Sequence, residues 1–522
     1  MTVKSILALF SVLLIAQNSL SQEIKWGGKI KEKRRIVVNN IVSHSGNETI
    51  LFKSNMFSAS VMVKPNCSLE KFNGQFNQVK KSKIEPTYND KKLQVEYCFE
   101  SGGKIFMLTT FANTKLDKRF LFVQEINRQS LKPQGKMRKI AELKYRKRYR
   151  AGDFGYEFSR DSSHILIYAN SETKRNEPDQ YALGVFDPEF NEVWSREVTL
   201  PYSESRFVLK DYTVDNNGNA FILGLRYPEK GEGERKRGKS TYDYRILSYR
   251  QDGSEATEYT AEIGDLFLTD MMIDVSPQKD IICAGFYSER GTWSAKGTYF
   301  LRIDRKTKEV SKVSLKEFEP DFITMNFTAR QKRKAKKKAA KGKSIELYRY
   351  DLRDLIPRGD GGVVMLAEQF YITTYSTTDQ YGNIRYHTNY HYNTVVAVSI
   401  SPEGDIEWAT KVPKHQVSTD DGGYFSSYVS MITNEKLYLL YNDTKKNLEK
   451  NVKLRNYDLR DKNGIIMLAS IDAEGNVERR PLMSNDDIST ILVPKLSAQV
   501  NRKELFLFGK RGKKSQMGIA TF

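Results

Sequence analysis

Three observations predict an all-β fold made of repeated sheets. Tight turns of similar composition recur along the 522-residue chain, compact apolar runs of strand length accompany them, and most units lack a helical pattern between these features. Aromatic residues make up 11% of the chain and include 29 tyrosines, a composition that suits strands. Because repetition at intervals of tens of residues is typical of stacked architectures, we expect one repeated fold.

The recurring turn is clearest in SPEGDIEWATKVP, residues 401–413. An apolar residue is followed by Asp or Ser, by two or three turn residues that often include Gly or Asn, and by a strand that begins with an apolar residue. Short hairpins need such residues because they supply positive or fixed backbone angles at low cost. Comparable stretches, which bring the number of hairpins to seven, begin at Val63, Ile126, Phe186, Tyr249, Ile303 and Ile471.

The apolar runs give the remaining strands of each unit. They are TILF at 49, IFML at 105, ILIY at 165, AFILG at 220, IICAG at 281, VVML at 363, LYLL at 437 and LFLFG at 505. Strands that are apolar at consecutive positions are covered on both faces. A turn such as VDNNGN or PRGDGG precedes the run, and a further extended segment precedes that turn. Each unit is therefore predicted to be a four-stranded antiparallel meander.

Sheets of this kind bury both faces of their middle strands when they pack face to face in a ring, so the repeat predicts a β-propeller. We count eight blades, and seven fit if one unit is irregular. The eighth unit stops at Phe522 where a fourth strand would begin, and EIKW at 23–26 resembles the fourth-strand openings DIEW at 405 and NEVW at 191. We therefore expect the N- and C-terminal strands to pair and close a single domain over residues 22–522.

The first 21 residues have the features of an export signal. A lysine precedes an apolar run from Ile6 to Ala16, and small residues at Ser19 and Ser21 suit signal peptidase. The run is too short to span a bilayer, and no later stretch predicts a transmembrane segment. The first cysteine, Cys67, lies beyond any cleavage site, so no lipid anchor is expected. The prediction is an exported protein of the periplasm or of the cell surface and extracellular space.

Three cysteines, Cys67, Cys98 and Cys283, cannot build a disulfide framework in a chain of this length. Its stability must come from a core, and 39% hydrophobic residues supply one. The formal net charge of +20 favours contact with polyanions.

A basic insertion at 328–346, TARQKRKAKKKAAKGKSIE, interrupts the repeat. Alanine and lysine favour a helix there, although repulsion between charges three and four residues apart opposes it. One interpretation is a contact with an anionic surface, and the other is a solvated loop between blades. The candidate contact residues are Arg330, Lys332, Arg333, Lys334, Lys336, Lys337, Lys338, Lys341 and Lys343.

Further basic clusters lie at 132–150, 31–35 and 510–514, and the last two should be close together if the termini pair. Nucleic acid is not expected as a partner, because Tyr145 and Tyr149 are the only aromatics interleaved as stacking platforms need. The stretch Gly233–Ser240 matches a phosphate-binding loop formally, but a strand-like segment follows it where a helix is required. We interpret it as a chance match in a charged hairpin loop.

A second insertion, at 370–393, is a polar and aromatic excursion between the second and third strands of a blade. His387 and His391 would share one face of a strand and, with Tyr386 and Tyr390, form a candidate ligand loop for a metal or a sugar. No third metal ligand stands nearby at a familiar spacing, so a long aromatic hairpin is the favoured interpretation. No metal and no cofactor are predicted.

Carboxylates at the ends of first strands would face the central channel. Asp211, Asp270 and Asp354, together with Arg353, are the candidates for this channel rim. They are interpreted either as turn caps, which is the favoured role of Asp at such positions, or as a catalytic cluster.

The stretches IPRGDGGVVMLAEQFY, IEWATKVPKHQVSTDDGGYFSSY and LYLLYND resemble those of uncharacterised exported β-propeller proteins of Gram-negative bacteria with elaborate envelopes. The resemblance implies the fold and carries no catalytic residue. We expect a non-enzymatic binding or scaffold protein of the envelope, whose partner is an envelope protein or an anionic glycan or lipid surface. The alternative is a hydrolase or lyase acting on an acidic polysaccharide or peptide through the channel-rim carboxylates.

Overall fold

The computed structural model describes residues 23–33, 36–55, 66–113, 115–144, 154–171, 178–203, 205–227, 235–236, 239–276, 280–291, 293–325, 327–433, 436–449, 454–457, 463–484 and 490–522. The predicted export signal at 1–21 lies outside them.

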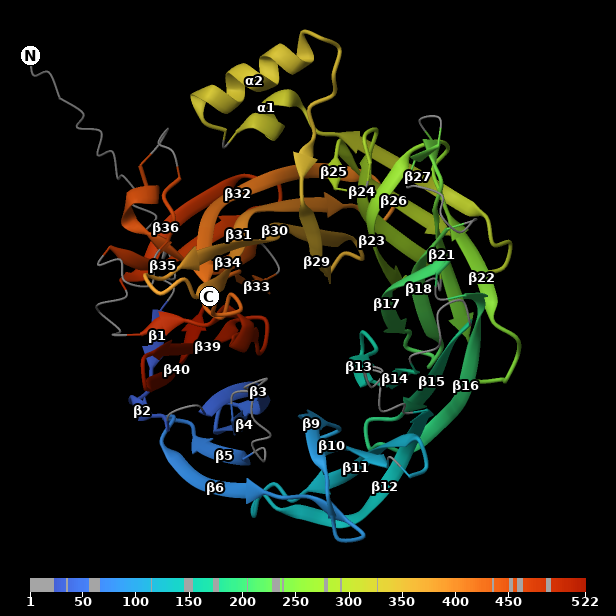
Figure 1. Ribbon diagram of the computed structural model, residues 1–522, viewed down its shortest axis with the longest axis vertical. Coiled ribbons are helices and arrows are strands. Elements are labelled where there is room, and N and C mark those ends of the chain that lie inside the picture. Colours follow the sequence, from blue (N-terminus) through green and yellow to red (C-terminus); the bar gives the residue numbers. More distant parts are fainter. Residues whose placement is uncertain are drawn as a thin grey trace, which may run out of the picture.

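The described residues form a ring of eight antiparallel sheets, or blades, around a central axis (Figure 1). The predicted all-β propeller with eight blades is therefore confirmed. In blades 1 to 7 the first strand along the chain lies nearest the central axis and the fourth lies on the outer rim (Figure 1). Blades 1 to 4 consist of β3 (Ile36–Ser45), β4 (Glu48–Asn55), β5 (Cys67–Asn73) and β6 (Gln78–Ile84); β9 (Gln94–Ser101), β10 (Lys104–Asn113), β11 (Lys118–Ile126) and β12 (Pro133–Lys144); β13 (Phe154–Phe158), β14 (Ile165–Ser171), β15 (Pro178–Phe186) and β16 (Glu192–Ser203); and β17 (Phe207–Val214), β18 (Ala220–Arg226), β21 (Asp243–Tyr249) and β22 (Thr257–Ala261).

Blades 5 to 8 continue the ring. They consist of β23 (Phe267–Val275), β24 (Ile281–Ser288), β26 (Gly297–Ile303) and β27 (Val310–Glu317); β29 (Tyr350–Pro357), β30 (Val363–Thr378), β31 (Ile384–Ile400) and β32 (Ile406–Thr419); β33 (Val429–Ile432), β34 (Leu437–Thr444), β35 (Gly464–Ile471) and β36 (Val477–Ser484); and β37 (Ile491–Leu492), β39 (Glu504–Arg511), β40 (Lys514–Thr521) and β1 (Glu23–Trp26).

The ring closes through blade 8, where the two ends of the described chain share one sheet. β1 pairs antiparallel with β40, with Lys25 opposite Ile519 and Trp26 opposite Gly518. β2 (Ile30–Lys31) extends this pairing and places Lys31 opposite Lys514. The predicted pairing of the termini is confirmed, and the basic clusters at 31–35 and 510–514 are neighbours over their described residues.

Smaller elements connect or extend the blades. They are the pairs β7 (Thr87–Tyr88) with β8 (Lys91–Lys92), β19 (Arg235–Lys236) with β20 (Lys239–Ser240) and β25 (Ser294–Ala295) with β28 (Leu347–Tyr348); β38 (Ala498–Gln499), which joins β39; helices α1 (Pro320–Thr324) and α2 (Ala329–Ala339); and 3₁₀ turns η1 (Lys445–Asn447) and η2 (Pro494–Leu496).

The core consists of apolar layers between neighbouring blades. All eight apolar runs of the sequence are second strands, and their alternate side chains enter different layers. In β24, Ile281 and Cys283 pack against blade 4, whereas Ile282 and Ala284 pack against blade 6. A second strand must therefore be apolar at consecutive positions, because each of its faces meets another blade.

The described part of the phosphate-loop match lies in the β-hairpin β19–β20, and the strand β21 follows it. The interpretation of this stretch as a charged hairpin is confirmed for these residues. The three cysteines are buried and free.

One of the seven predicted hairpins was wrongly placed. The stretch beginning at Val63 leads into β5, the third strand of blade 1, and its first three residues lie outside the described ranges. The hairpin between β5 and β6 is instead the turn at 73–78, where Phe76 adopts a φ of 59° and the Asn73 side chain accepts the Asn77 amide. This turn lacks the Asp or Ser of the other units, so the pattern did not detect it.

Candidate functional site

The three predicted channel aspartates occupy the same position in adjacent blades. Asp211, Asp270 and Asp354 lie in β17, β23 and β29, and in each case the register with the second strand shifts just before the aspartate. Such a bulge inserts one extra residue and redirects the side chains that follow it. The aspartates therefore lie within the first strands, which corrects their interpretation as turn caps.

A glycine makes room for the bulge in blade 5. A Cβ atom on Gly285 would lie 2.0 Å from the carbonyl oxygen of Asp270, so only glycine fits there. The same carbonyl accepts a hydrogen bond from the Tyr299 hydroxyl at 3.1 Å. The position of Asp270 thus depends on a contact that the first strand alone does not reveal.

Asp270 connects two blades through backbone amides. Its carboxylate accepts the amide of Met271 in its own strand and that of Leu352 in blade 6, each at 3.1 Å. Burial raises the pKa of Asp270 and of Asp211, although Asp211 accepts the Tyr212 amide at 2.9 Å. These bonds give both carboxylates a structural role.

A fourth acid, Glu157 of β13 in blade 3, extends this series. Desolvation by the surrounding residues raises its pKa to about 7 although the residue itself is exposed, and the nearby charge of Asp211 adds to the shift. Burial also raises the pKa of Asp354, against the effect of the adjacent Arg353. The acidic series therefore passes from blade 3 to blade 6.

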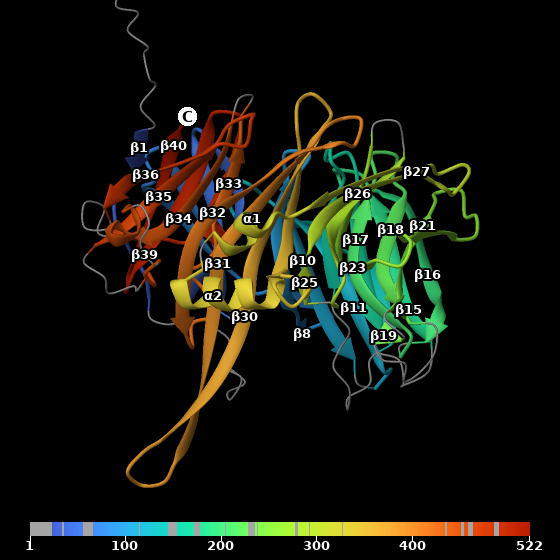
Figure 2. The same cartoon turned by 90° about the horizontal axis from the view of Figure 1, so that it is seen from above.

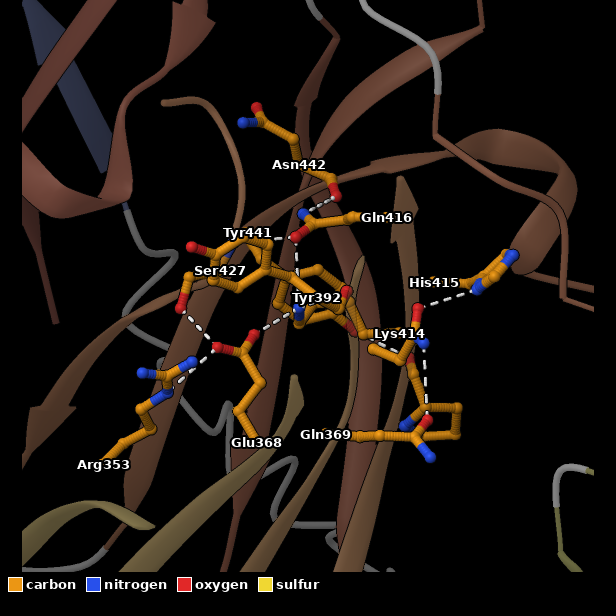
Figure 3. A network of polar contacts seen from close by, with 12 residues as sticks. Arg353, Glu368, Gln369, Tyr392, Lys414, His415, Gln416, Ser427, Tyr441 and Asn442 are labelled. Atoms are coloured by element: carbon orange, nitrogen blue, oxygen red, sulfur yellow. Dashed lines mark hydrogen bonds and ion pairs between the residues drawn. The ribbon is translucent and has the colours of Figure 1, made fainter. Parts of the chain in front are cut away.

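A buried ion pair lies beside this series, between blades 6 and 7 (Figure 3). The Nζ atom of Lys414 is 2.6 Å from Glu368 Oε1, and both side chains are fully buried. Lys414 also donates to the Tyr392 carbonyl at 2.9 Å and to Gln416 Oε1 at 3.1 Å. Ser427, next to blade 7, donates to the other oxygen of Glu368 at 2.8 Å.

Arg353 is the second cation on Glu368, at 3.4 Å between Nε and Oε2. Its guanidinium lies over the rings of Phe370 and Tyr392. Burial lowers the pKa of Lys414, and the Glu368 carboxylate opposes this by favouring the ammonium form. The predicted Arg353 therefore belongs to an inter-blade network whose buried members, Glu368 and Lys414, we did not predict.

The predicted ligand loop is the outer part of the β30–β31 hairpin, which projects far beyond the ring (Figure 2). His387 contacts Asp420 at 2.7 Å and stacks on Tyr375. His391 contacts Thr373 at 2.9 Å and stacks on the ring of Tyr371.

The strand geometry separates the four predicted residues of this loop. His387 and His391 share one face, as expected, but Tyr386 and Tyr390 alternate to the opposite face. Four residues of strand also separate the two histidines by about 13 Å. The hairpin therefore does not bring the four predicted residues together into one ligand site.

No group of three or more His, Cys, Asp or Glu side chains able to hold a metal occurs among the described residues. A hollow of about 180 Å³ lies between blades 2 and 3, with Glu142, Arg196 and Glu197 in its lining. None of the predicted site residues lines it.

The basic insertion forms α2, which extends along the outside of the ring beside blade 6 (Figure 1). Thr328 and Gln331 form a capping box at its start, and Ala335 is its buried residue. The nine predicted basic side chains are exposed, and none of them forms an ion pair or a side-chain hydrogen bond with another described residue. The opposing effects of composition and charge repulsion are therefore resolved in favour of a helix over 329–339, whereas the anionic-surface contact stays a prediction.

Lys411 of β32 fixes α1, which precedes the insertion, to blade 6. Its Nζ donates to the carbonyl oxygens of Phe322 at 2.5 Å and Ile323 at 3.2 Å, and it lies over the Phe322 ring. Burial lowers the pKa of Lys411 to about 7. Phe318, Ile323 and Leu347 complete an apolar layer beneath the two helices.

The comparisons with known proteins bear on the fold alone. No family model and no curated protein matches the chain. Similar solved structures include the β-propeller domain of the Trilobed protease from Pyrococcus furiosus, at 10% identity and a TM-score of 0.36 over 87% of this chain and 97% of that one. The Dos1 propeller has 9% identity and a TM-score of 0.31 over 82% of this chain and 94% of that chain.

Acylaminoacyl peptidase from Pyrococcus horikoshii has 10% identity and a TM-score of 0.35, and 92% of this chain matches 60% of that chain. This chain thus spans about three fifths of the length of that peptidase. Likenesses at these values say nothing about activity or partner. Within the described ranges, no helix combines the length and apolar character that crossing a membrane requires.

Proposed function

We propose that this protein is an exported, non-enzymatic binding or scaffold propeller of the bacterial envelope, which contacts an anionic surface through residues 328–346. The observation that carries the proposal is the exposure of nine cations around α2 without an acidic partner among the described residues. Like charges three and four residues apart destabilise a helix. An anionic surface would relieve this repulsion, because each basic residue near it contributes about 1 kcal/mol of attraction.

The position of the insertion supports the same role. The capping box orders α2, and Lys411 holds α1 against β32, so the cations lie on a fixed support on the outer rim. The segment 328–344 contains no aromatic residue, so stacking platforms for single-stranded nucleic acid are missing from it. Phosphate headgroups and acidic glycans both provide the complementary charge.

Vesicle binding tests this proposal. We expect the purified protein to cosediment with vesicles that contain phosphatidylglycerol but not with phosphatidylcholine vesicles, and to dissociate as salt is raised. Replacing Lys336, Lys337, Lys338 and Lys341 with Gln should weaken binding by at least about tenfold, equivalent to about 1.4 kcal/mol.

A matched control replaces four exposed lysines of blade 1 and its connector, Lys80, Lys83, Lys91 and Lys92, with Gln. This variant has the same net charge as the α2 variant and should bind as the wild type does. Equal loss of binding in both variants would show that binding depends only on the net charge of the protein and would contradict the proposal. An acidic polysaccharide in place of vesicles distinguishes glycan from lipid as the source of the anion.

The second candidate function is a hydrolase or lyase on an acidic polysaccharide or peptide. It is favoured by Glu157, whose pKa of about 7 suits a general acid, beside the carboxylate of Asp211. Turnover of such a substrate by the wild type, abolished in Glu157→Gln and retained in the α2 variant, would establish this candidate over the first.

A further inference from the structure

The outer part of the β30–β31 hairpin has a strand edge that no other described strand covers. β29 pairs with β30 only as far as Gln369, and the amide of Phe370 then donates to the Arg349 carbonyl at 3.0 Å. β32 likewise pairs with β31 only between Asn389 and Ile400. Beyond these points the two strands pair only with each other and project from the ring (Figure 2).

The backbone groups that face this free edge can be identified from Thr388. Its amide donates to Asp420 Oδ1 at 2.8 Å, and its carbonyl accepts the Asp420 amide at 2.9 Å, so both groups point away from β30. Thr374, which lies opposite, is therefore in a non-hydrogen-bonded pair, and its own amide and carbonyl point outward. Alternation gives the same outward direction to Ile372 and Ser376.

This edge lacks the devices by which proteins prevent strands from pairing. Residues 370–378, FYITTYSTT, contain no charge and no proline, in a chain whose net charge is +20. Natural edge strands are normally protected by lysine, proline or a covering element. The absence of these features favours the addition of another strand here.

Exposed apolar side chains occur along the projecting hairpin, where Ile372 is 47% and Tyr375 45% exposed, as well as near its turn and at its base. Tyr381 and Tyr386 near the turn are 80% and 76% exposed. Near the base, Trp293 is 63% and Tyr348 51% exposed, and Arg349 lies over both rings and over Tyr371. Aromatic side chains are enriched in protein interfaces relative to the rest of the surface.

We propose that a second copy of this chain pairs with the free edge of β30, antiparallel and about a two-fold axis near Thr374. Such a pairing is isologous, so each copy offers the same surface to the other. It places Ile372 opposite Ser376 and Tyr375 opposite Thr373 of the second copy, and aromatic side chains stabilise β-branched ones across strands. The turn of each hairpin then reaches the aromatic base of the other.

Charge also favours this arrangement over a closer contact between rings. With the axis at Thr374, Gln369 of one copy, the last residue that pairs with β29, lies about 33 Å along the strand from Gln369 of the other copy. Repulsion between two chains of charge +20 is largely screened beyond about 8 Å at physiological salt.

Sedimentation velocity over a range of concentrations tests the proposal. The wild type should sediment as a dimer, and Thr374→Pro should be monomeric at concentrations at which the wild type is dimeric. Proline removes an amide that points outward, so the ladder to β31 stays intact. Thr374→Val keeps the amide and should remain dimeric, and Ile372→Lys provides a second disruptive variant if the proline variant does not fold.

Cysteine crosslinking tests the register. Thr374→Cys should form a disulfide between copies, because the two-fold axis brings this residue to its own equivalent, whereas Tyr386→Cys on the other strand should not. The three native cysteines are buried and should not contribute. A monomeric wild type, a dimer that survives in Thr374→Pro and Ile372→Lys, or open-ended oligomers would each overturn the proposal.

Discussion

The side chain of Glu368 shows how a single buried charge can depend on residues far along the chain. Glu368 lies in β30, where the five preceding residues of the strand are apolar, and its carboxylate meets Lys414, Arg353 and Ser427. Removing one member of a buried pair is costly, because it leaves the other charge uncompensated, whereas replacing both is often tolerated.

We therefore predict that Lys414→Met lowers the free energy of unfolding by about 3–5 kcal/mol. The double variant Glu368→Gln, Lys414→Met should recover part of this loss, since the buried carboxylate is then gone, while Arg353 loses its ion pair with Glu368. Denaturant unfolding of the wild type, both single variants and the double variant gives the coupling free energy. Additive losses would show that the two groups act independently.

Lys411 gives a pH-dependent prediction. Burial lowers the pKa of its ammonium from 10.5 to about 7. Between these values the unfolded chain retains a proton that the folded chain has released, so the contribution of Lys411 to stability rises as pH rises through this window. The gain is at most about 1.4 kcal/mol per pH unit.

Urea unfolding at several pH values within the window measures this slope, and Lys411→Met serves as the control. Subtracting the control removes contributions from other groups that titrate there. Equal slopes in the two proteins would rule out the titration of Lys411 as their source.

At the scale of elements, α2 was only half predicted. Its alanines and lysines favour a helix and their mutual repulsion opposes one, so composition alone left the outcome open. The decisive signal is the pair Thr328 and Gln331, a capping box that is visible in the sequence and that an argument from composition does not include. The long β30–β31 hairpin was predicted correctly, because its polar and aromatic residues alternate without helix signals.

The capping box itself can be tested. Thr328→Ala should lower the stability of α2 by about 1 kcal/mol, while Thr328→Ser should preserve it. Hydrogen exchange of the amides in 329–339 measures this directly, and we expect exchange about fivefold faster in the alanine variant. Exchange at the same rate in all three proteins would mean that packing against α1, and not the cap, orders the helix.

For the whole molecule, the ring was predictable because its signals are local and repeated. Every apolar run marks a second strand, and the resemblance of EIKW to other fourth strands gave the closure. The candidate site was harder to predict from the sequence. The bulge before Asp270 depends on Gly285 in the next strand, and the Glu368–Lys414 contact joins strands that are distant along the chain. Such pairings arise from packing and leave no pattern in a single sequence.

Closure of the ring leads to a final prediction about connectivity. Glu23 is paired with Thr521, so a short Asn-Gly linker from Phe522 to Glu23 would make β40 and β1 an ordinary hairpin. New termini between Asn89 and Asp90, in the exposed turn between β7 and β8, leave every blade intact. This permutant should fold and melt at or above the wild-type temperature, because the two closing strands no longer have to meet from distant ends of the chain.

The matched control is the same permutant with residues 23–26 deleted. It should melt lower and aggregate, since β40 then becomes an unprotected edge and Trp26 no longer packs against Met483. Thermal unfolding and light scattering of both permutants measure the contribution of β1. Equal melting temperatures would show that the ring is held by the layers between its other blades and that β1 contributes little to closure.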